Sequence, residues 1–350
     1  MSCSCSQTSH SIITNNYTNK NPPTLCTVIT MINTPKSCSQ CQGKLKAQWI
    51  LKEFAHQFAD YGHARCRKCG ISFDSNINEV SQTKIDSAAE IQNLDEKDYR
   101  GLFVEASKIA DEQDNIYASF DWDNNDEVKA GVANHVIKVI ESQHNDGISN
   151  FADVGCGSGF MSFEIAKIYN KATVHAIDPS PLVRQLKQND QVKPHQGTLQ
   201  TANLDSDSID ALSIIGNWML HMDPIDTLKE TKRVLRPGGT LILDFKNIKS
   251  ASRVVASIAL RLGLDRFGGR HMLQRNFVNM RYGFNKKYVL RSLEEQGFSV
   301  VSIHSKPPRL LEFNNKSHYQ KGLTGAIWRF LNKIDGLRNE HAWIQIVAKA

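Results

Sequence analysis

Residues 151–160 read FADVGCGSGF, an apolar run that ends in an acid and is followed by glycine at every second position. Glycine adopts backbone conformations that other residues avoid, and it has no Cβ to hold a ligand away from the main chain. The stretch therefore predicts a strand, a sharp turn and a helix over 161–168 whose first N–H groups face a ligand. The GxGxG spacing, with Asp153 two positions ahead of the first glycine, differs from the GxGxxG fingerprint of dinucleotide-binding turns.

The residues after this turn alternate between strand-like and helix-like patterns. Residues 173–177 are β-branched and alternating, and they stop at Asp178 and Pro179. An acid at the end of a second parallel strand, about 20 residues beyond the turn, is placed to meet a ribose diol. Residues 209–215 predict a buried strand, and 228–243 predict an amphipathic helix, a Pro-Gly-Gly turn and another strand. This order predicts an α/β fold with a right-handed, doubly wound parallel sheet.

These blocks together resemble class I S-adenosylmethionine (SAM)-dependent methyltransferases, in the broad group that includes the ubiquinone/menaquinone type. The matching segments are ADVGCGSGF (152–160), VHAIDPS (174–180), QGTLQTANLDSDSIDAL (196–212), NWMLHMDP (217–224) and RVLRPGGTLIL (233–243). Residues 283–305 and 343–350 resemble the helix and the last two strands of that fold. The resemblance implies a seven-stranded, mostly parallel sheet whose final strand is antiparallel, SAM as cofactor, and methyl transfer as the activity.

The resemblance also assigns roles to individual residues. The three glycines of the turn approach the methionine portion of SAM, and Asp178 accepts hydrogen bonds from the ribose. Thr198 stands where relatives usually carry the acid that meets the adenine amino group, which puts that side-chain contact in doubt. The expected cofactor-binding set is Asp153, Gly155, Gly157, Gly159, Asp178, Pro179, Ser180, Thr198, Leu199, Gly216 and Asn217.

His221 is the candidate general base of this site. It lies in the NWMLHMDP block, aligned with a histidine that many relatives carry. A base is needed only if the acceptor must lose a proton, because methyl transfer is otherwise a matter of positioning two partners. The alternative is that His221 is a structural hydrogen-bonding residue.

Two CxxC pairs near the N-terminus predict a metal site. Cys38, Cys41, Cys66 and Cys69 would supply four thiolates to a tetrahedral Zn²⁺ ion of structural type. Free thiols or a disulfide are the alternatives. Residues 50–61 between the pairs have apolar positions at helical spacing, although 61–65 fit a strand equally well. Cys156, inside the glycine turn, is interpreted as a small space-filling residue and not as a nucleophile.

Charge is distributed unevenly along the chain. The whole chain has a net charge of +6. Residues 79–127 contain fourteen acids and four bases, whereas residues 246–291 contain eleven bases and one acid. The basic segment follows the fifth strand, where this fold commonly covers the acceptor pocket. It would hold an anionic acceptor or rest on an acidic surface, or else the two segments are solvated faces that partly pair. Residues 252–264 form an apolar helical stripe that suits a lid or, alternatively, an interfacial helix in peripheral contact with a membrane.

The acceptor is not specified by a motif. The residues after the fourth strand, Gly216-Asn217-Trp218-Met219, lack the signature for exocyclic amino groups of bases. We therefore expect a small-molecule, sugar or lipid-linked acceptor. The alternatives are an RNA base methyltransferase that grips phosphates with its zinc module and basic segment, and a catalytically inactive SAM-binding scaffold.

The chain of 350 residues divides by composition into four parts. We expect a disordered tail over 1–33, a zinc-ribbon-like module over 34–75, an acidic helical linker or lid over 76–130, and the methyltransferase domain over 131–350 with its basic insertion at 246–285. The sequence leaves open whether residues 1–30 belong to the native protein. It has neither a secretory signal pattern nor an apolar run long enough for a membrane span, so a cytoplasmic location is expected.

Overall fold

The computed structural model describes residues 37–38, 41–50, 62–66, 68, 72–74, 126–186, 190–221, 223–261, 282–306 and 322–350. The chain divides into two units, Met1–Met31 and Ile32–Ala350, and every described residue belongs to the second. The expected tail over 1–33 and nearly all of the acidic segment over 76–130 lie outside the described residues.

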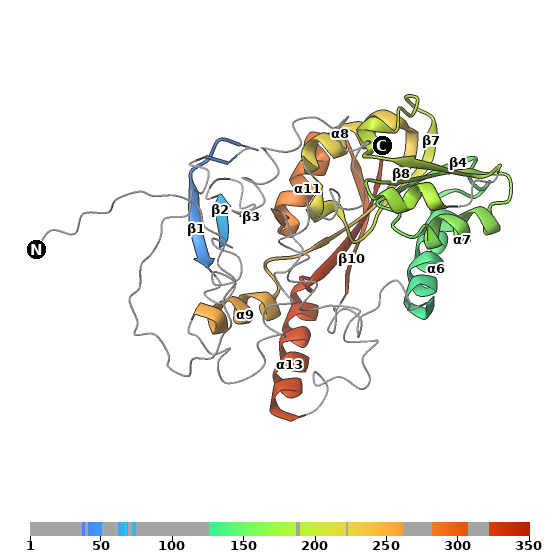
Figure 1. The fold of residues 1–350 in the computed structure, drawn as a ribbon. Coiled ribbons are helices and arrows are strands. Elements are labelled where there is room, and N and C mark those ends of the chain that lie inside the picture. Colours follow the sequence, from blue (N-terminus) through green and yellow to red (C-terminus); the bar gives the residue numbers. More distant parts are fainter. Residues whose placement is uncertain are drawn as a thin grey trace, which may run out of the picture. The chain divides into compact units, whose positions relative to one another are not determined.

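A seven-stranded sheet forms the centre of the fold (Figure 1). Its strand order is β10-β11-β8-β7-β4-β5-β6. Four neighbouring pairs are parallel, and β11 pairs antiparallel with both β8 and β10. The strands are β4 (Asn150–Val154), β5 (Thr173–Asp178), β6 (Val192–Gln196), β7 (Ile209–Ile214), β8 (Leu235–Lys246), β10 (Ser299–Lys306) and β11 (Trp343–Lys349). The predicted doubly wound, mostly parallel sheet with an antiparallel final strand is confirmed.

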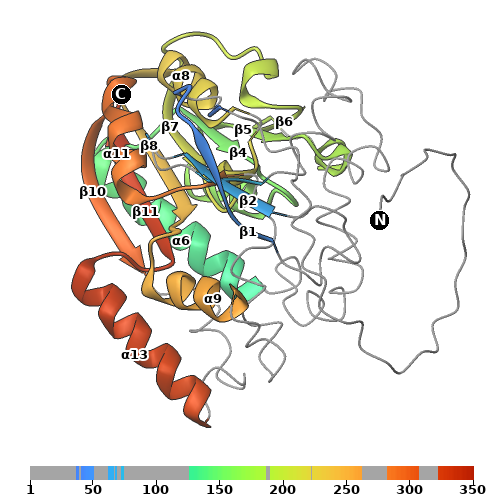
Figure 2. The same cartoon turned by 90° about the vertical axis from the view of Figure 1, so that its left-hand side faces the viewer.

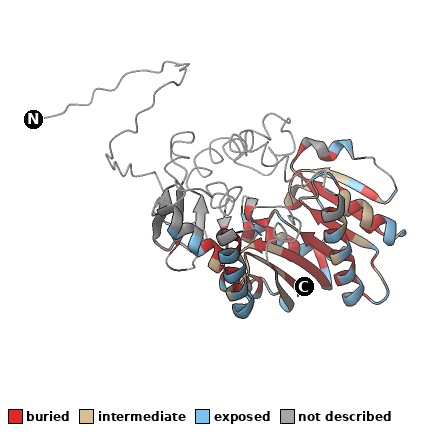
Figure 3. Ribbon diagram, turned by 90° about the horizontal axis from the view of Figure 1, so that it is seen from below, coloured by how far each residue is buried: buried red, intermediate tan, exposed pale blue. Residues whose placement is uncertain are grey.

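Helices cover both faces of this sheet because its strands are apolar on both sides. One face packs on α6 (Asp126–Gln143) and α7 (Phe160–Ile168), and its core includes Phe151, Val174 and Ile242. The other face packs on α8 (Pro224–Val234) and α11 (Lys286–Glu295), and its core includes Leu212, Leu241 and Ile346. Figure 3 shows the resulting buried centre between exposed outer helix faces.

The carboxyl ends of the parallel strands carry short turns and helices that build the site. These are η2 (Pro181–Gln185) after β5, η3 (Leu199–Thr201) after β6 and η4 (Trp218–Leu220) after β7. Beyond β8, α9 (Ala251–Arg261) packs against α13 (Gly322–Arg338), as Figures 1 and 2 show. No helix in the described part of the chain combines the length and the apolar character that crossing a bilayer requires.

A second sheet has the order β1-β2-β3-β9. Its strands are β1 (Leu45–Ile50), β2 (Gly62–Cys66), β3 (Ser72–Asp74) and β9 (Tyr282–Gly283). The apolar spacing over 50–61 predicts a helix beginning at Ile50. This is wrong for Ile50, which is the last residue of β1 and pairs with Gly62. The alternative strand over 61–65 fits β2, and residues 51–61 lie outside the described residues.

The predicted Pro-Gly-Gly turn over 237–239 is part of the range of β8. Gly238 has φ +76°, and the register of β8 against β7 shifts between Ile209 and Ala211. The left-handed glycine therefore produces an irregularity within one strand, in place of a separate turn between a helix and a strand.

Candidate functional site

The glycine turn between β4 and α7 has the left-handed backbone that its sequence predicts. Gly155, Gly157 and Gly159 have φ values of +75°, +54° and +73°. The N–H of Gly155 donates to the carbonyl of Ile177 at 2.7 Å, so the start of the turn is attached to the end of β5. A residue with a side chain would be strained at each of these three positions.

The glycines of this edge differ in what surrounds them. A Cβ at Gly155 would stand 2.1 Å from Asn217 Nδ2, and one at Gly159 would stand 2.8 Å from Leu186 Cδ1. At Gly157 and Gly216, which has φ +78°, no atom of the described residues other than the chain neighbours lies within 4 Å of that position. Glycine is therefore required at 155 and 159 because protein atoms leave no room for a side chain. At Gly157 and Gly216 the absence of a side chain leaves the backbone open to an approaching group.

Asp178 is in direct contact with this turn. Its Oδ2 accepts from the N–H of Gly157 and its Oδ1 from the N–H of Ser180, both at 2.8 Å. Pro179 lies between them, and its carbonyl accepts from Gln196 Nε2 at 3.4 Å. The structure thus brings the glycine turn and the carboxylate of the second strand together. The ribose contact of Asp178 stays a prediction.

Asp153 lies beneath the turn and is buried. Its carboxylate accepts from Ser162 Oγ on α7 at 2.7 Å and from Ser213 Oγ on β7 at 3.1 Å. Burial raises the pKa of Asp153 to about 6, against the effect of the two hydroxyl hydrogen bonds. The sequence singled out Asp153 but neither serine, so the clamp that joins β4, α7 and β7 is a new finding.

Cys156 sits within the turn and is partly buried. Burial, reinforced by Asp153 and Asp178, raises the pKa of this thiol far above its ordinary value. Because the thiolate is the nucleophile in cysteine chemistry, this environment suits an inert small residue.

Asn217 and His221 form a hydrogen-bonded pair behind Gly155. Asn217 Nδ2 donates to the carbonyls of Val154 at 2.8 Å and Ile215 at 3.0 Å, so these carbonyls fix which amide atom is nitrogen. Asn217 Oδ1 therefore accepts at 2.8 Å from His221 Nε2, which must carry a proton. His221 Nδ1 lies 3.0 Å from Thr227 Oγ1 on α8. Both ring nitrogens contact protein groups, and the role of His221 as a base stays a prediction.

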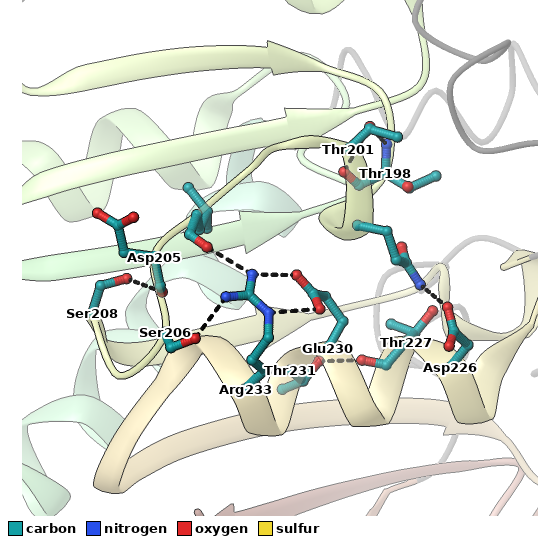
Figure 4. A network of polar contacts seen from close by, with 12 residues as sticks. Thr198, Thr201, Asp205, Ser206, Ser208, Asp226, Thr227, Glu230, Thr231 and Arg233 are labelled. Atoms are coloured by element: carbon teal, nitrogen blue, oxygen red, sulfur yellow. Dashed lines mark hydrogen bonds and ion pairs between the residues drawn. The ribbon is translucent and has the colours of Figure 1, made fainter.

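The loop with Thr198 and Leu199 is anchored on α8. Gly197 donates to the carbonyl of Asp178 at 3.0 Å, and Leu199 is buried in the core. Thr198 Oγ1 is buried, and Thr198 forms a reciprocal cap with Thr201 at the start of η3, in which the N–H of Thr198 donates to Thr201 Oγ1 at 2.9 Å. Figure 4 shows the network that fixes this region, in which Arg233 of α8 binds the Leu204 carbonyl, Ser206 and Glu230, and Gln200 binds Asp226.

Asp244 is a member of this edge that the sequence analysis did not single out. Its Oδ1 accepts from the N–H of Gly216 at 2.6 Å. Like Asp178, it is an acid at the carboxyl end of an apolar strand, and that signal was present in the sequence.

Lys246 lies close to Asp244, and Arg253 lies close to Lys246. Lys246 follows on the same side of β8, with its Nζ 5.6 Å from the centre of the Trp343 ring. Burial, together with the neighbouring charge of Arg253, lowers the pKa of Lys246 to about 7. Arg253, on α9, is itself buried.

Three of the four predicted zinc ligands are described, and they converge. The sulfurs of Cys38, Cys41 and Cys66 all lie within 4.8 Å of one another, and Cys41 and Cys66 are 3.5 Å apart. Two sulfurs on one tetrahedral zinc ion stand about 3.8 Å apart, given Zn–S bonds of about 2.3 Å. A disulfide would require about 2.05 Å. Cys69 lies outside the described residues.

The backbone around these cysteines is closely packed. The N–H of Lys68 donates to Cys66 Sγ at 3.3 Å, and the N–H of Cys38 donates to the carbonyl of Gly43 at 2.8 Å. A Cβ at Gly43 would stand 2.9 Å from Cys66 Sγ, so only glycine fits without a shift. A backbone N–H directed at a sulfur, as that of Lys68 is at Cys66 Sγ, is a contact that a metal-bound thiolate can accept.

Comparisons with known proteins agree with this architecture. Residues 152–243 match the family model for a methyltransferase domain. The chain is 29% identical over 147 residues to malonyl-[acyl-carrier protein] O-methyltransferase of Hahella chejuensis (strain KCTC 2396). The matched segment covers 40% of this chain and 50% of that protein. The chain thus spans about half the length of this curated relative.

Solved structures show more distant likenesses. Geranyl diphosphate C-methyltransferase from Streptomyces coelicolor A3(2) is 15% identical with a TM-score of 0.44, covering 64% of this chain and 79% of its own. The plantazolicin methyltransferase is 14% identical with a TM-score of 0.45, and the match covers 70% of this chain and 93% of that protein. Both scores are low, so the assignment of the fold rests on the observed strand order and on the family match. On that basis residues 152–243 are a methyltransferase domain of the class I, SAM-dependent type, built on a Rossmann-like sheet.

Proposed function

We propose that this protein binds SAM at the carboxyl edge of its sheet and transfers the methyl group to a small acceptor that carries an anionic group. The observation that carries the proposal is the contact between the Gly157 N–H and the Asp178 carboxylate. It places the glycine turn and the expected ribose-binding acid side by side. A carboxylate only accepts hydrogen bonds, so Asp178 suits the hydroxyl groups of a ribose as partners.

The residues present suit SAM. Gly157 and Gly216 have left-handed backbones with no described side chain over them, which lets a ligand reach the main chain. The buried hydroxyl of Thr198 lies where the adenine contact is expected, beside its capping partner Thr201. We infer that this hydroxyl hydrogen-bonds the adenine edge in place of the acid that relatives carry. When bound, SAM supplies the methyl group in an in-line displacement from its sulfonium.

The charges of the site favour a cationic ligand over a dinucleotide. Asp153 and Asp178 are close enough for the charge of one to raise the pKa of the other, and Asp244 is attached to Gly216. These three carboxylates at the carboxyl ends of β4, β5 and β8 attract a sulfonium and an ammonium group. The same carboxylates repel the pyrophosphate of a dinucleotide.

We infer that the acceptor lies beside Gly216 and Asn217, toward the end of β8. His221 engages Asn217 and Thr227 through its two ring nitrogens, which suits an acceptor atom that needs no base. An oxygen that is already anionic meets this condition. Arg253 supplies positive charge near the same end of β8, and Lys246, with its pKa lowered to about 7, is partly protonated at neutral pH. The curated relative is named as an O-methyltransferase of malonyl-[acyl-carrier protein], an acceptor of this chemical kind.

We further propose that Cys38, Cys41, Cys66 and Cys69 bind one Zn²⁺ ion. The convergence of three sulfurs and the packing at Gly43 support a preformed site. Thiolate ligands closed in a tetrahedron, with no open position for water, suit a structural ion and not a catalytic one.

The experiment that tests the proposed function is transfer of tritium from methyl-labelled SAM into fractionated cell extract by the full-length protein. We expect label in acidic small-molecule or carrier-linked fractions, sensitive to mild base if the product is an ester. Label in RNA would replace the proposed acceptor by the RNA alternative. SAM binding without transfer into any fraction would favour the inactive scaffold.

A further inference from the structure

The sheet that carries the cysteine cluster is completed by a distant part of the chain. Cys66 ends β2, and β2 pairs with β3 through Arg65–Ser72 and Ala64–Phe73. On its other side, β3 pairs antiparallel with β9 through Ser72–Gly283 and Phe73–Tyr282. The outer edge of β3 is thus occupied by the protein's own residues 282–283, next to the end of the basic insertion.

Residue 284, which follows β9 directly, is fixed in the methyltransferase domain. Phe284 is fully buried, and its ring stacks on Trp218 with centroids 4.1 Å apart and an interplanar angle of 18°. Its carbonyl accepts from the N–H of Ile248 at 2.9 Å, just beyond β8. A displacement of residues 282–283 would therefore act on a tightly packed aromatic contact.

Trp218 connects this contact to the proposed acceptor side. It follows Asn217, whose amide holds Val154 and Ile215 and accepts from His221. The indole N–H of Trp218 donates to the carbonyl of Pro224 at the start of α8. Cys38 and Cys66 belong to the same buried cluster as Trp218 and Phe284.

We propose that the cysteine module acts as a metal-dependent brace for the acceptor side of the methyltransferase domain in the same chain. With metal bound, β3 holds β9 in place, and β9 holds Phe284 against Trp218. The inference rests on the proposed metal site and gives it a role within the proposed function. It differs from recruitment of RNA or a partner protein through β3, because that edge of β3 is already paired with β9.

The test is hydrogen–deuterium exchange of the full-length protein with zinc bound and after removal of zinc by a chelator. On metal loss we expect exchange to become about tenfold faster or more in peptides covering 72–74 and 282–290. The control peptide is 173–178 in β5, where exchange should stay unchanged. Faster exchange at 72–74 with unchanged exchange at 282–290 would overturn the proposal.

Faster exchange at 173–178 would show that metal loss unfolds the whole chain. In that case a variant that keeps its zinc tests the brace. The variant carries both Tyr282→Pro and Gly283→Pro. Adjacent N–H groups of a strand point to opposite sides, so one of these two faces β3. Proline has no backbone N–H, so the double substitution removes the donor on that side whichever residue supplies it. We expect this zinc-loaded variant to keep its metal and to exchange faster over 284–290. Unchanged exchange there would contradict the brace.

The brace and the proposed function can fail separately. Calorimetric titration of the same zinc-loaded preparation with SAM reports on the function alone. Absence of SAM binding would end the proposed function and leave the exchange result to decide the brace. Normal SAM binding with unchanged exchange at 282–290 would end the brace alone.

Discussion

The N–H of Gly157 donates to the Asp178 carboxylate across 2.8 Å, joining the turn after β4 to the end of β5. The two residues are 21 positions apart, and parallel pairing of β4 with β5 brings them to the same edge. Asp178 therefore stabilises the glycine turn, and we propose that the same carboxylate accepts hydrogen bonds from the ribose of SAM.

Replacing Asp153 with asparagine tests the buried carboxyl beneath the turn. Its folded pKa of about 6 lies above the ordinary value of 3.8, so the folded state holds this proton more tightly than the unfolded state. This preference stabilises the folded state by at most about 3 kcal/mol. The stabilisation is fully present below pH 4 and is lost as the pH rises through 6. Urea unfolding at several pH values should show that Asp153→Asn removes this pH dependence. The exposed Asp146→Asn should retain it, and an unchanged slope in Asp153→Asn would refute the assignment.

The glycines of the turn should respond unequally to alanine. Both Gly155→Ala and Gly157→Ala incur the left-handed backbone penalty of about 1–2 kcal/mol. Gly155→Ala also displaces the Asn217 amide, and each of its hydrogen bonds contributes about 1 kcal/mol. Chemical denaturation should therefore rank Gly155→Ala as the less stable variant.

Gly131→Ala in α6 is the control for this series. Beyond its own helix and its chain neighbours, no atom of the described residues lies within 4 Å of the position that a Cβ would take there. The substitution should stabilise the protein by up to about 1 kcal/mol through helix propensity. Equal losses at Gly155 and Gly157 would mean that the contact with Asn217 is not tight.

The hydrogen bonds of Asn217 predict the tautomer of His221. Because the Asn217 carbonyl oxygen accepts from Nε2, the neutral imidazole should carry its proton there, with Nδ1 unprotonated and facing the Thr227 hydroxyl. Nitrogen NMR of labelled histidine should identify the Nε2-protonated form, and Asn217→Leu should abolish this preference. A neutral ring protonated at Nδ1 would contradict the proposed geometry.

Metal content is expected to depend on the cysteine cluster and on Gly43. Elemental analysis of the purified protein should give about one zinc per chain, as a four-thiolate site requires. Cys66→Ser should lose the metal, and Gly43→Ala should bind it more weakly because its Cβ presses on Cys66 Sγ. Cys156→Ser removes a thiol outside the cluster and should keep the metal. Zinc retained by Cys66→Ser would exclude this site.

Much of the fold could be predicted because its signals are local. A glycine turn after an apolar strand and the alternation of helix and strand patterns gave the sheet, and the end of β5 gave Asp178. Asp244 offered the same signal at the end of β8 and was overlooked. Ser213, a polar residue inside a buried strand, was a weaker sign of the Asp153 clamp, and Ser162 on α7 had no local sign at all.

The cysteine module was harder to predict for a physical reason. Residues 45–50 form a strand because they pair with β2, and that pairing is not visible in the spacing of Ile50 with the apolar residues after it. The pairing of β3 with β9 joins positions more than 200 residues apart. A two-residue strand such as β9 has no periodicity of its own to detect.

The central claim is that Asp178 and the glycine turn form a SAM site, and calorimetric titration with SAM tests it most directly. We expect micromolar-range binding to the wild-type protein and to the exposed-site control Asp146→Asn. Asp178→Ala should weaken binding about tenfold to a hundredfold, because hydrogen bonds to a charged group contribute about 1.5–3 kcal/mol. Undiminished SAM affinity in Asp178→Ala, or no binding by the wild-type protein, would contradict the claim.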